Sequence, residues 1–359
     1  MKTDRPDQIA FIHLLRGVAP LIVLWAHLGG WWLYVAGRTS GLQTGWTDLV
    51  CRPFHLYQDG GHLGVLLFFL VSGFVITHVS LRENRGEFLV RRVFRLMPTL
   101  IVAVACLPPL AWACAKLDLP APMGTESTSY FSGILLLNYF TGGPQVLTVL
   151  WTLFIEVLFY ALTFGLIAFS KRRPIAATWL MLAVPHLLNV AAIAVPSLRM
   201  AMWGVMYLPF LLIGRCIYLG WSHKEDFHQA LLVGLVSYGS FLLIYENISP
   251  GRLFLPGGGP AISHLYAVGI FLALCASGLR KIPAVLSFAA EISYSLYLLH
   301  APLGGTLLFL LTKHGIPYEM ALPIAILVVV GTSYLVFRTV ELPAQGLGRR
   351  ICLRLRGSE

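Results

Sequence analysis

The sequence predicts an all-α integral membrane protein, a bundle of about ten transmembrane helices with both termini in the cytoplasm. Of its 359 residues, 57% are hydrophobic and 12% are charged, whereas soluble domains carry roughly 25% charged residues. The mean hydropathy is +0.76. So few charges cannot cover a globule of 39.6 kDa, and most of the surface must therefore face lipid. These numbers exclude a soluble enzyme.

Apolar segments recur along the whole chain at the length of membrane spans. The expected spans are 10–36, 62–80, 96–115, 147–170, 174–195, 199–219, 229–246, 261–279, 284–311 and 319–340. No cleavage site precedes the first segment, so it is expected to be a retained helix. The apolar run 130–140 is too short to cross and precedes a Gly-Gly-Pro sequence, which predicts a re-entrant or interfacial segment.

The charged residues predict the topology. The net charge is +10, and with ten spans 17 Lys and Arg residues fall on the N-terminal side against 6 on the other. This asymmetry places both termini in the cytoplasm and favours a topological role for the charge over a nucleic-acid partner. One transmembrane domain over 1–345 and a short basic cytoplasmic tail over 346–359 are expected. The six cysteines follow no disulfide or zinc spacing, and no metal is predicted.

Ionisable residues inside the first span require a partner or a function, because each costs about 2.5–3.5 kcal/mol to insert. Arg16 and His27 are eleven residues apart, close to three helical turns, so they share one face at a separation of about 16 Å. Arg16 is expected in the cytoplasmic half of the membrane and His27 in the outer half. A snorkelling Arg16 and a structurally satisfied His27 are the alternative interpretations.

The next two spans carry a small-residue pair and a basic cluster. Ser72 and Gly73 form a small notch in the second span, for which close helix packing is the simplest explanation. Arg91, Arg92 and Arg95 precede the third span and share a face at the cytoplasmic boundary. Such a cluster suits a lipid headgroup and a phosphorylated ligand equally well.

The fourth span contains an unexpected carboxylate. Thr152, Glu156 and Tyr160 recur every four residues and form a polar stripe on an apolar helix. Glu156 is expected in the outer part of the membrane, at a depth similar to that of His27. A structural pairing with an arginine is the alternative, but the sequence places no obvious arginine at that depth.

The ninth span has a second polar stripe. Ser293, Tyr297 and His300 fall on one face, at steps of four and three residues, and His300 is expected in the outer half. Such a stripe also serves to join helices. The scarce ionisable groups thus separate by depth, with arginines inside and His27, Glu156 and His300 outside. A histidine paired with a carboxylate is the arrangement that general base catalysis needs.

Six motifs in order resemble those of the membrane acyltransferase-3 family. They are Arg16 and His27 with ten residues between them, FFLVSGF (68–74), RRVFRLMP (91–98), WTLFIEVLFY (151–160), SYSLYLLH (293–300) and VELP (340–343). The resemblance covers most of the chain. It departs from the family pattern at Thr152, where members more often have serine, but the hydroxyl is kept. The chain is expected to be the stand-alone form, without a fused esterase-like domain.

The resemblance implies a membrane O-acyltransferase of the bacterial inner membrane that uses cytoplasmic acyl-CoA, with acetyl-CoA as the expected donor. Arg16, Arg92 and Arg95 would bind the phosphates of the donor. His27 would act as the general base on a sugar hydroxyl or carry the acyl group transiently, with Glu156 as its orienting partner.

The acceptor implied by the resemblance is a glycan, such as an exopolysaccharide, an O-antigen or a lipid-linked oligosaccharide. Tyr297, His300 and Trp151 would line its side of the site. A succinyl group is an alternative to acetyl. The competing functional class is a proton-coupled carrier or flippase for a lipid-linked sugar or a small anion, since an inner basic cluster and outer histidines suit that role too.

Overall fold

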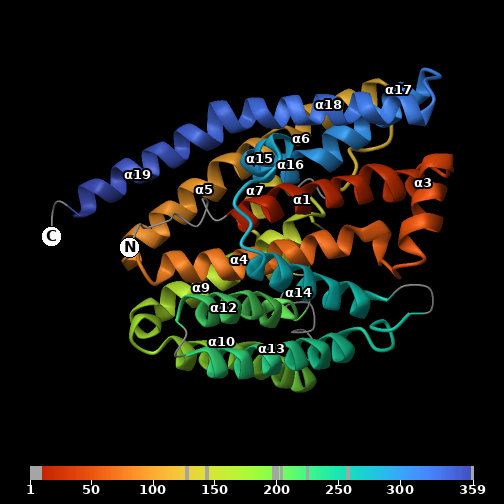
Figure 1. Ribbon diagram of the computed structural model, residues 1–359. Coiled ribbons are helices and arrows are strands. Elements are labelled where there is room, and N and C mark those ends of the chain that lie inside the picture. The colour runs from red at the N-terminus through yellow and green to blue at the C-terminus, as the bar shows by residue number, and fades with distance from the viewer. Residues whose placement is uncertain are drawn as a thin grey trace.

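A computed structural model describes residues 10–125, 129–141, 145–195, 202, 205–223, 226–255 and 259–356. Across these ranges the regular structure is helical, and no strand is present. The helices form a bundle in which the start of α1 (Ala10–Ala26) and the end of α19 (Leu342–Arg356) lie at the same end (Figure 1). The predicted all-α class is confirmed.

The first third of the chain forms three long helices. Its elements are α1, η2 (His27–Trp31), α2 (Trp32–Val35), α3 (Gly41–Trp46), η3 (Thr47–Cys51), η4 (Gln58–Gly60), α4 (Gly61–Ser80), α5 (Arg85–Ala105) and α6 (Leu107–Lys116). Helix α1 runs through the π-helical turn η2 into α2 as one apolar helix of 26 residues. Helix α5 begins well before the predicted span, because Asn84 and Glu87 form a capping box at its start.

The middle of the chain contains α7 (Tyr130–Ile134), α8 (Asn138–Thr141), α9 (Leu150–Arg172), α10 (Pro174–Ala194), α12 (Leu208–Ser222), α13 (Phe227–Ile248) and α14 (Pro260–Ala276). The run 130–140 folds as the two short helices α7 and α8, neither long enough to cross. Pro174 starts α10 and separates it from α9, because proline has no N–H to continue the preceding helix.

The C-terminal third consists of α15 (Ala284–Glu291), α16 (Ser293–Leu299), η7 (His300–Gly304), α17 (Gly305–Lys313), α18 (Tyr318–Val336), η8 (Phe337–Glu341) and α19. The predicted span 284–311 is interrupted at Ile292, so its membrane-length helix begins only at Ser293. The last predicted span, 319–340, continues without a break into α19, so described residues of the expected tail extend the final helix.

In the described residues, eight helices are long and apolar enough to cross a membrane. Two further apolar helices, α12 and α14, are shorter, with 15 and 17 residues. A helix of 15 residues is about 22 Å long, less than the roughly 30 Å of a hydrocarbon core. These helices occupy the predicted spans 199–219 and 261–279. The count of ten spans and the cytoplasmic termini stay predictions.

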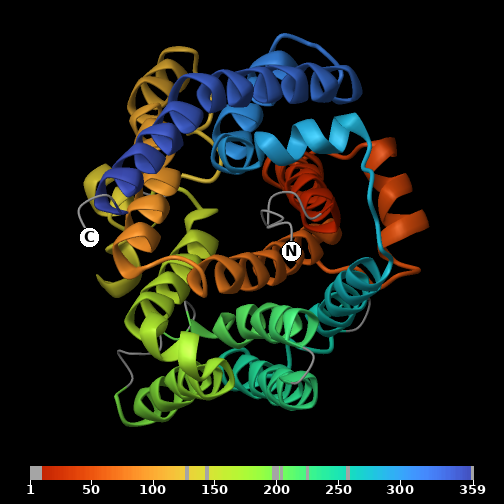
Figure 2. The ribbon, with the colours of Figure 1, turned by 60° about the vertical axis from the view of Figure 1, so that its left-hand side comes forward.

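Helix α4 is the centre of the bundle. It contacts α1, α9, α12 and α14, and it lies between the helices of the middle region and those of the two ends of the chain (Figure 2). Gly73 and Gly214 allow α4 and α12 to approach closely, since a Cβ at Gly73 would lie 1.9 Å from the Leu211 carbonyl oxygen. The predicted packing role of the Ser72–Gly73 notch is therefore confirmed for Gly73.

Candidate active site

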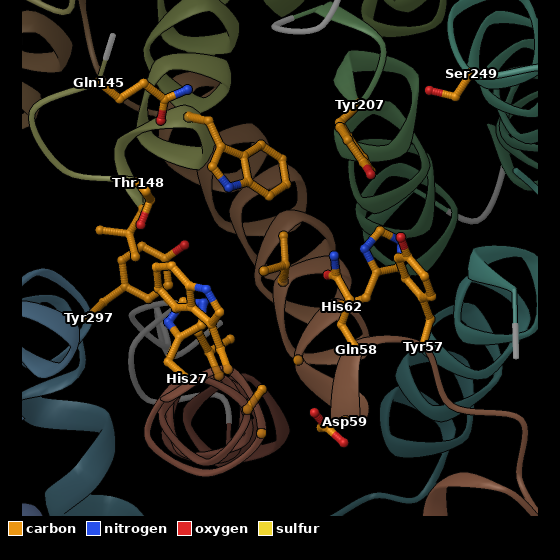
Figure 3. A pocket seen from close by; sticks show the side chains of 18 of the residues that line it. His27, Tyr57, Gln58, Asp59, His62, Gln145, Thr148, Tyr207, Ser249 and Tyr297 are labelled. Carbon is orange, nitrogen blue, oxygen red and sulfur yellow. The ribbon is translucent and has the colours of Figure 1, made fainter. Parts of the chain in front are cut away.

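A cavity of about 930 Å³ is lined by residues of α1, η2, α4, α9, α13 and α16, among other elements. One wall carries His27 from η2 and Tyr297 from α16, and the other carries His62 from the start of α4 and Tyr207 beside α12 (Figure 3). Trp151, at the start of α9, also lines the cavity. Side chains from distant parts of the sequence therefore meet in a space large enough for a small-molecule substrate.

His27 and His300 form a direct pair on the first wall. Nδ1 of His27 lies 2.7 Å from Nε2 of His300. The two rings are nearly coplanar, with an interplanar angle of 5° and centroids 5.0 Å apart, so the bond lies in the plane of both imidazoles. His27 lines the cavity, whereas His300 is 1% exposed and lies behind it. His300 was predicted to line the acceptor side, and the structure instead places it against His27.

The protonation of this pair follows from one backbone carbonyl. Nδ1 of His300 lies 3.0 Å from the Leu296 carbonyl oxygen, which only accepts hydrogen bonds. His300 Nδ1 must therefore carry the proton, and in the neutral ring Nε2 is an acceptor. His27 Nδ1 then donates to it, which leaves Nε2 of His27 with a free lone pair. The remaining nitrogen of His27 is thus a hydrogen-bond acceptor, with no bond to the described residues.

Both histidines begin π-helical turns. His27 is the first residue of η2 and His300 is the first residue of η7, and these two turns contact each other. A π turn inserts one additional residue into a helix and is frequent at functional sites. A third π turn, η8, has Glu341 as its last residue. We infer that these turns set the directions of the three side chains.

Tyr297 is held rigidly beside the histidine pair. Thr152 donates its hydroxyl proton to the Val149 carbonyl oxygen (2.9 Å), so the Tyr297 hydroxyl, 2.8 Å away, donates to Thr152. The ring of Tyr297 stacks on Phe68 and lies 5.9 Å from the ring of His300. The structure therefore brings Tyr297 and His27 together at the cavity, together with Trp151.

Glu156 lies one helical turn deeper than Thr152 and does not pair with His27. It accepts a hydrogen bond from Ser72 Oγ (2.7 Å) and another from the hydroxyl of Tyr160. It also interacts electrostatically with Arg95. The predicted contact between Glu156 and His27 is therefore wrong, since His300 occupies the position expected for the carboxylate. The expectation that no arginine reaches the depth of Glu156 is also wrong, because α5 starts early enough to carry Arg95 into the bundle.

Two of the predicted donor-binding arginines, Arg16 and Arg95, interact with the carboxylate of Glu341. This carboxylate accepts hydrogen bonds from Ser295 (2.8 Å) and Gln345 (3.1 Å) and interacts electrostatically with Arg16 and Arg95. Glu341 is 4% exposed. Glu341 belongs to the VELP motif (340–343) and was not predicted as a site residue, although a carboxylate at the end of an apolar span was a usable signal.

Two of the three arginines that were predicted to share a face lie together, because Arg92 and Arg95 both interact electrostatically with Tyr160. The guanidinium of Arg92 is buried over the rings of Phe88 and Tyr160, at 5.7 and 5.9 Å. Arg91 instead pairs with Glu83, at 3.1 Å. Arg16, Arg92 and Arg95 thus lie with Tyr160, Glu156 and Glu341 as one inner cluster, which Thr152 and Tyr297 connect to the cavity.

The described residues contain no group of three or more His, Cys, Asp or Glu side chains placed to bind a metal ion.

Comparison with known proteins identifies the family. A family model described as an acyltransferase domain, that of the acyltransferase-3 family, matches residues 9–338. The chain is also similar to Nodulation protein 10 of Rhizobium leguminosarum bv. viciae, with 26% identity over 263 residues, which cover 66% of this chain and 70% of that protein. No solved structure matches. The chain belongs to the acyltransferase-3 family.

Proposed function

We propose that the protein is a membrane-embedded O-acyltransferase. It transfers an acyl group, with acetyl as the expected group, from cytoplasmic acyl-CoA to a hydroxyl of an extracytoplasmic or lipid-linked glycan. The observation that carries this proposal is the His27–His300 pair, whose hydrogen bond to Leu296 leaves the lone pair of His27 Nε2 available at the cavity. A neutral imidazole fixed in this way is suited to general base catalysis. The family match supports acyl transfer as the reaction.

The proposed reaction needs one proton acceptor and one orienting group. Nε2 of His27 takes the proton of the glycan hydroxyl as that oxygen attacks the thioester carbonyl carbon. The carbon–sulfur bond then breaks, and the departing thiolate of coenzyme A takes the proton from His27. His300 accepts the hydrogen bond from His27 throughout, in the role that a carboxylate has in a catalytic triad.

The inner cluster is the proposed site for the phosphates of the donor. Arg16, Arg92 and Arg95 carry three formal positive charges against the two carboxylates of Glu156 and Glu341, an excess that favours an anionic ligand. In this arrangement Glu156 is a positioning residue that holds Arg95 and Tyr160. The long pantetheine arm would then reach the cavity beside Thr152 and Tyr297.

The proposed orientation places both termini and the inner cluster on the cytoplasmic side of a bacterial inner membrane. It is supported by the excess of Lys and Arg on that side and by the common position of the ends of α1 and α19 in the bundle (Figure 1). The cavity with His27 is then nearer to the opposite face, where an extracytoplasmic glycan would reach it. The division into a domain over 1–345 and a tail over 346–359 is part of the same proposal.

The direct test uses purified protein in proteoliposomes with radiolabelled acetyl-CoA and surface glycan from the source bacterium. The wild type should transfer label to the glycan. His27→Ala should reduce the rate by about 10²- to 10⁴-fold, the usual contribution of a general base. His186→Ala is the matched control, since His186 is a half-buried histidine outside the cavity lining that forms a hydrogen bond with Ser240 on α13.

Two outcomes would contradict the proposal. Wild-type transfer in His27→Ala would remove the catalytic assignment. Movement of glycan or anion across the membrane, with no transfer of label by the wild type, would favour the carrier. Label that stays on the protein and is lost in His27→Ala would instead identify His27 as an acyl carrier.

A further inference from the structure

The wall of the cavity opposite His27 contains a second histidine pair. Nε2 of His62 on α4 lies 3.0 Å from Nε2 of His264 on α14. Both side chains are buried, and only His62 lines the cavity. The ring of His264 is enclosed by the rings of Phe210, Phe241 and Tyr245. His264 therefore serves as a rigid support for His62.

The surroundings of His264 fix the proton positions of this pair. Nδ1 of His264 is buried without a hydrogen-bond partner among the described residues. A buried N–H without an acceptor is rarer than an unused lone pair, so the proton of His264 is on Nε2, from which it donates to His62. His62 then carries its own proton on Nδ1. This N–H is a donor, and no described residue accepts it.

Three tyrosines lie beside this histidine pair: the rings of Tyr57 and Tyr207 contact His62, and the ring of Tyr245 contacts His264. Tyr57, Tyr207 and Tyr245 all line the cavity, and the three lie close enough to interact electrostatically. None of these hydroxyls forms a hydrogen bond with the part of the chain that the structure describes, and none is among its buried polar atoms without a partner. The hydroxyls are therefore open to the cavity, where each can donate a hydrogen bond to a ligand and accept one from it.

The same wall has aromatic surface to pack against a ring. Tyr207 contacts Trp151, with ring centroids 5.3 Å apart, and both line the cavity. Phe69 and Phe241 pack behind them and fix the orientation of Tyr207 and Trp151. Aromatic faces attract the weakly positive C–H groups of a saturated ring. The combination of aromatic faces and hydroxyl partners is suited to a pyranose.

The rim of this wall is held in a strained conformation. Gln58 and Asp59 line the cavity with φ of +52° and +55°, values rare for residues other than glycine. Gln43 donates to the Asp59 carboxylate (2.8 Å), and the Trp46 indole donates to the Asp59 carbonyl oxygen (3.2 Å). These bonds keep the two side chains at the cavity at the expense of backbone energy, as is common at ligand sites.

We propose that His62, Tyr57, Tyr207 and Tyr245, with Trp151, form the acceptor subsite, which binds one pyranose unit of the glycan with a hydroxyl directed toward His27. This inference rests on the proposed function and deepens it. Tyr207 and Trp151 contact the apolar face of the sugar, and the tyrosine hydroxyls and His62 bond its hydroxyl groups. Specificity for the acceptor then resides in the wall opposite the catalytic pair.

Binding of simple sugars tests the subsite without requiring turnover. The probes are a panel of methyl pyranosides of gluco, galacto, manno and rhamno configuration, titrated into the protein in nanodiscs and followed by tryptophan fluorescence. At least one glycoside should quench the wild type saturably. Tyr207→Ala should weaken its binding at least tenfold, and Tyr207→Phe, which keeps the ring, about threefold to tenfold. Tyr238→Ala, at a half-buried tyrosine away from the cavity, is the control.

Each result decides for or against the subsite. The proposal is overturned if no glycoside in the panel binds the wild type, or if the dissociation constant is unchanged in both Tyr207→Ala and His62→Ala. Both variants are compared with the wild type by size-exclusion chromatography, and Tyr207→Phe supplies the answer if Tyr207→Ala does not fold. Failure of the proposed function is separable, because a protein that binds glycosides through Tyr207 but transfers no acetyl group retains the subsite and lacks the reaction.

Discussion

Two histidine pairs face one cavity, yet they present opposite chemistry to it. In the pair on η2 and η7, His300 is anchored by the Leu296 carbonyl oxygen, and His27 therefore presents a lone pair. In the pair on α4 and α14, Nδ1 of His264 has no such acceptor among the described residues, and His62 presents an N–H. The first pair can remove a proton from a substrate, whereas the second can only hold one in place.

The two histidine pairs also differ in the conformation of the backbone that carries them. His27 and His300 begin π-helical turns, whereas His62 and His264 lie on regular α-helices. The π turns redirect two side chains toward each other from helices that cross, which requires a local departure from the helical repeat. The role of a buried histidine therefore does not follow from its residue type alone. The group behind it decides whether it is a base or a binding residue.

Removing His300, the hydrogen-bond partner of His27, should reduce acyl transfer more than removing Arg95 or His264. In His300→Ala, Nδ1 of His27 loses its acceptor, so the ring is no longer held in the tautomer with a free Nε2. We expect kcat for acyl transfer to fall about 100-fold, with the KM for acyl-CoA unchanged. Steady-state kinetics with labelled acetyl-CoA measure both constants. A full-rate His300→Ala enzyme would show that the pair has no catalytic role.

Arg95 tests whether donor binding is separate from both histidine pairs. Arg95→Ala removes a cation that interacts with Glu156 and Glu341, and it should raise the KM for acyl-CoA by about tenfold, which is about 1.4 kcal/mol. Binding of methyl glycosides should stay the same. Arg85→Ala is the control, since Arg85 is an exposed arginine on the same helix. Unchanged dependence on acyl-CoA concentration would argue against a donor site at Arg95.

Removing the group behind His62 should have the smallest effect. His264→Leu deletes the hydrogen-bond donor that fixes the His62 proton on Nδ1, but it leaves the tyrosines and the His27 pair in place. Glycoside affinity should fall about threefold to tenfold, with kcat at saturating acceptor unchanged. The glycoside titration and the transfer assay measure the two quantities. A loss of kcat equal to that of His300→Ala would mean that the two pairs are not distinct in function.

The fold class followed from composition, but the helix boundaries did not. Hydropathy located the apolar part of each helix, whereas the ends are determined by local hydrogen bonding. Asn84 and Glu87 start α5 ahead of its apolar stretch, and Ile292 interrupts a segment that its mean hydropathy predicts as one span. Helix α12 is 15 residues long and packs against α4 and α13 inside the bundle.

The sequence predicted many of the residues of the site and few of their contacts. His27, Tyr297 and Trp151 do line the cavity, from the three separate segments η2, α16 and α9. His27 and Tyr297 were identified as polar residues within apolar spans, and Trp151 as part of the motif 151–160. The partner of His27 was missed, since the bond to His300 spans 273 residues and depends on two π turns that periodicity cannot foresee. His62 was missed because it lies at the start of a span, where a histidine gives no clear signal.

We propose that the cavity wall with His27 and Tyr297 performs the transfer and that the opposite wall, with His62 and Tyr207, binds the acceptor. The most direct measurement is the rate of acetyl transfer to a binding methyl glycoside, over a range of glycoside concentrations, in His27→Ala and His62→Ala. His27→Ala should lose turnover at every concentration and retain glycoside binding. His62→Ala should approach wild-type turnover at saturation, with a KM for the glycoside raised severalfold. The same loss of turnover in both variants, with glycoside binding intact in both, would contradict the assignment of catalysis to His27 and of acceptor binding to His62.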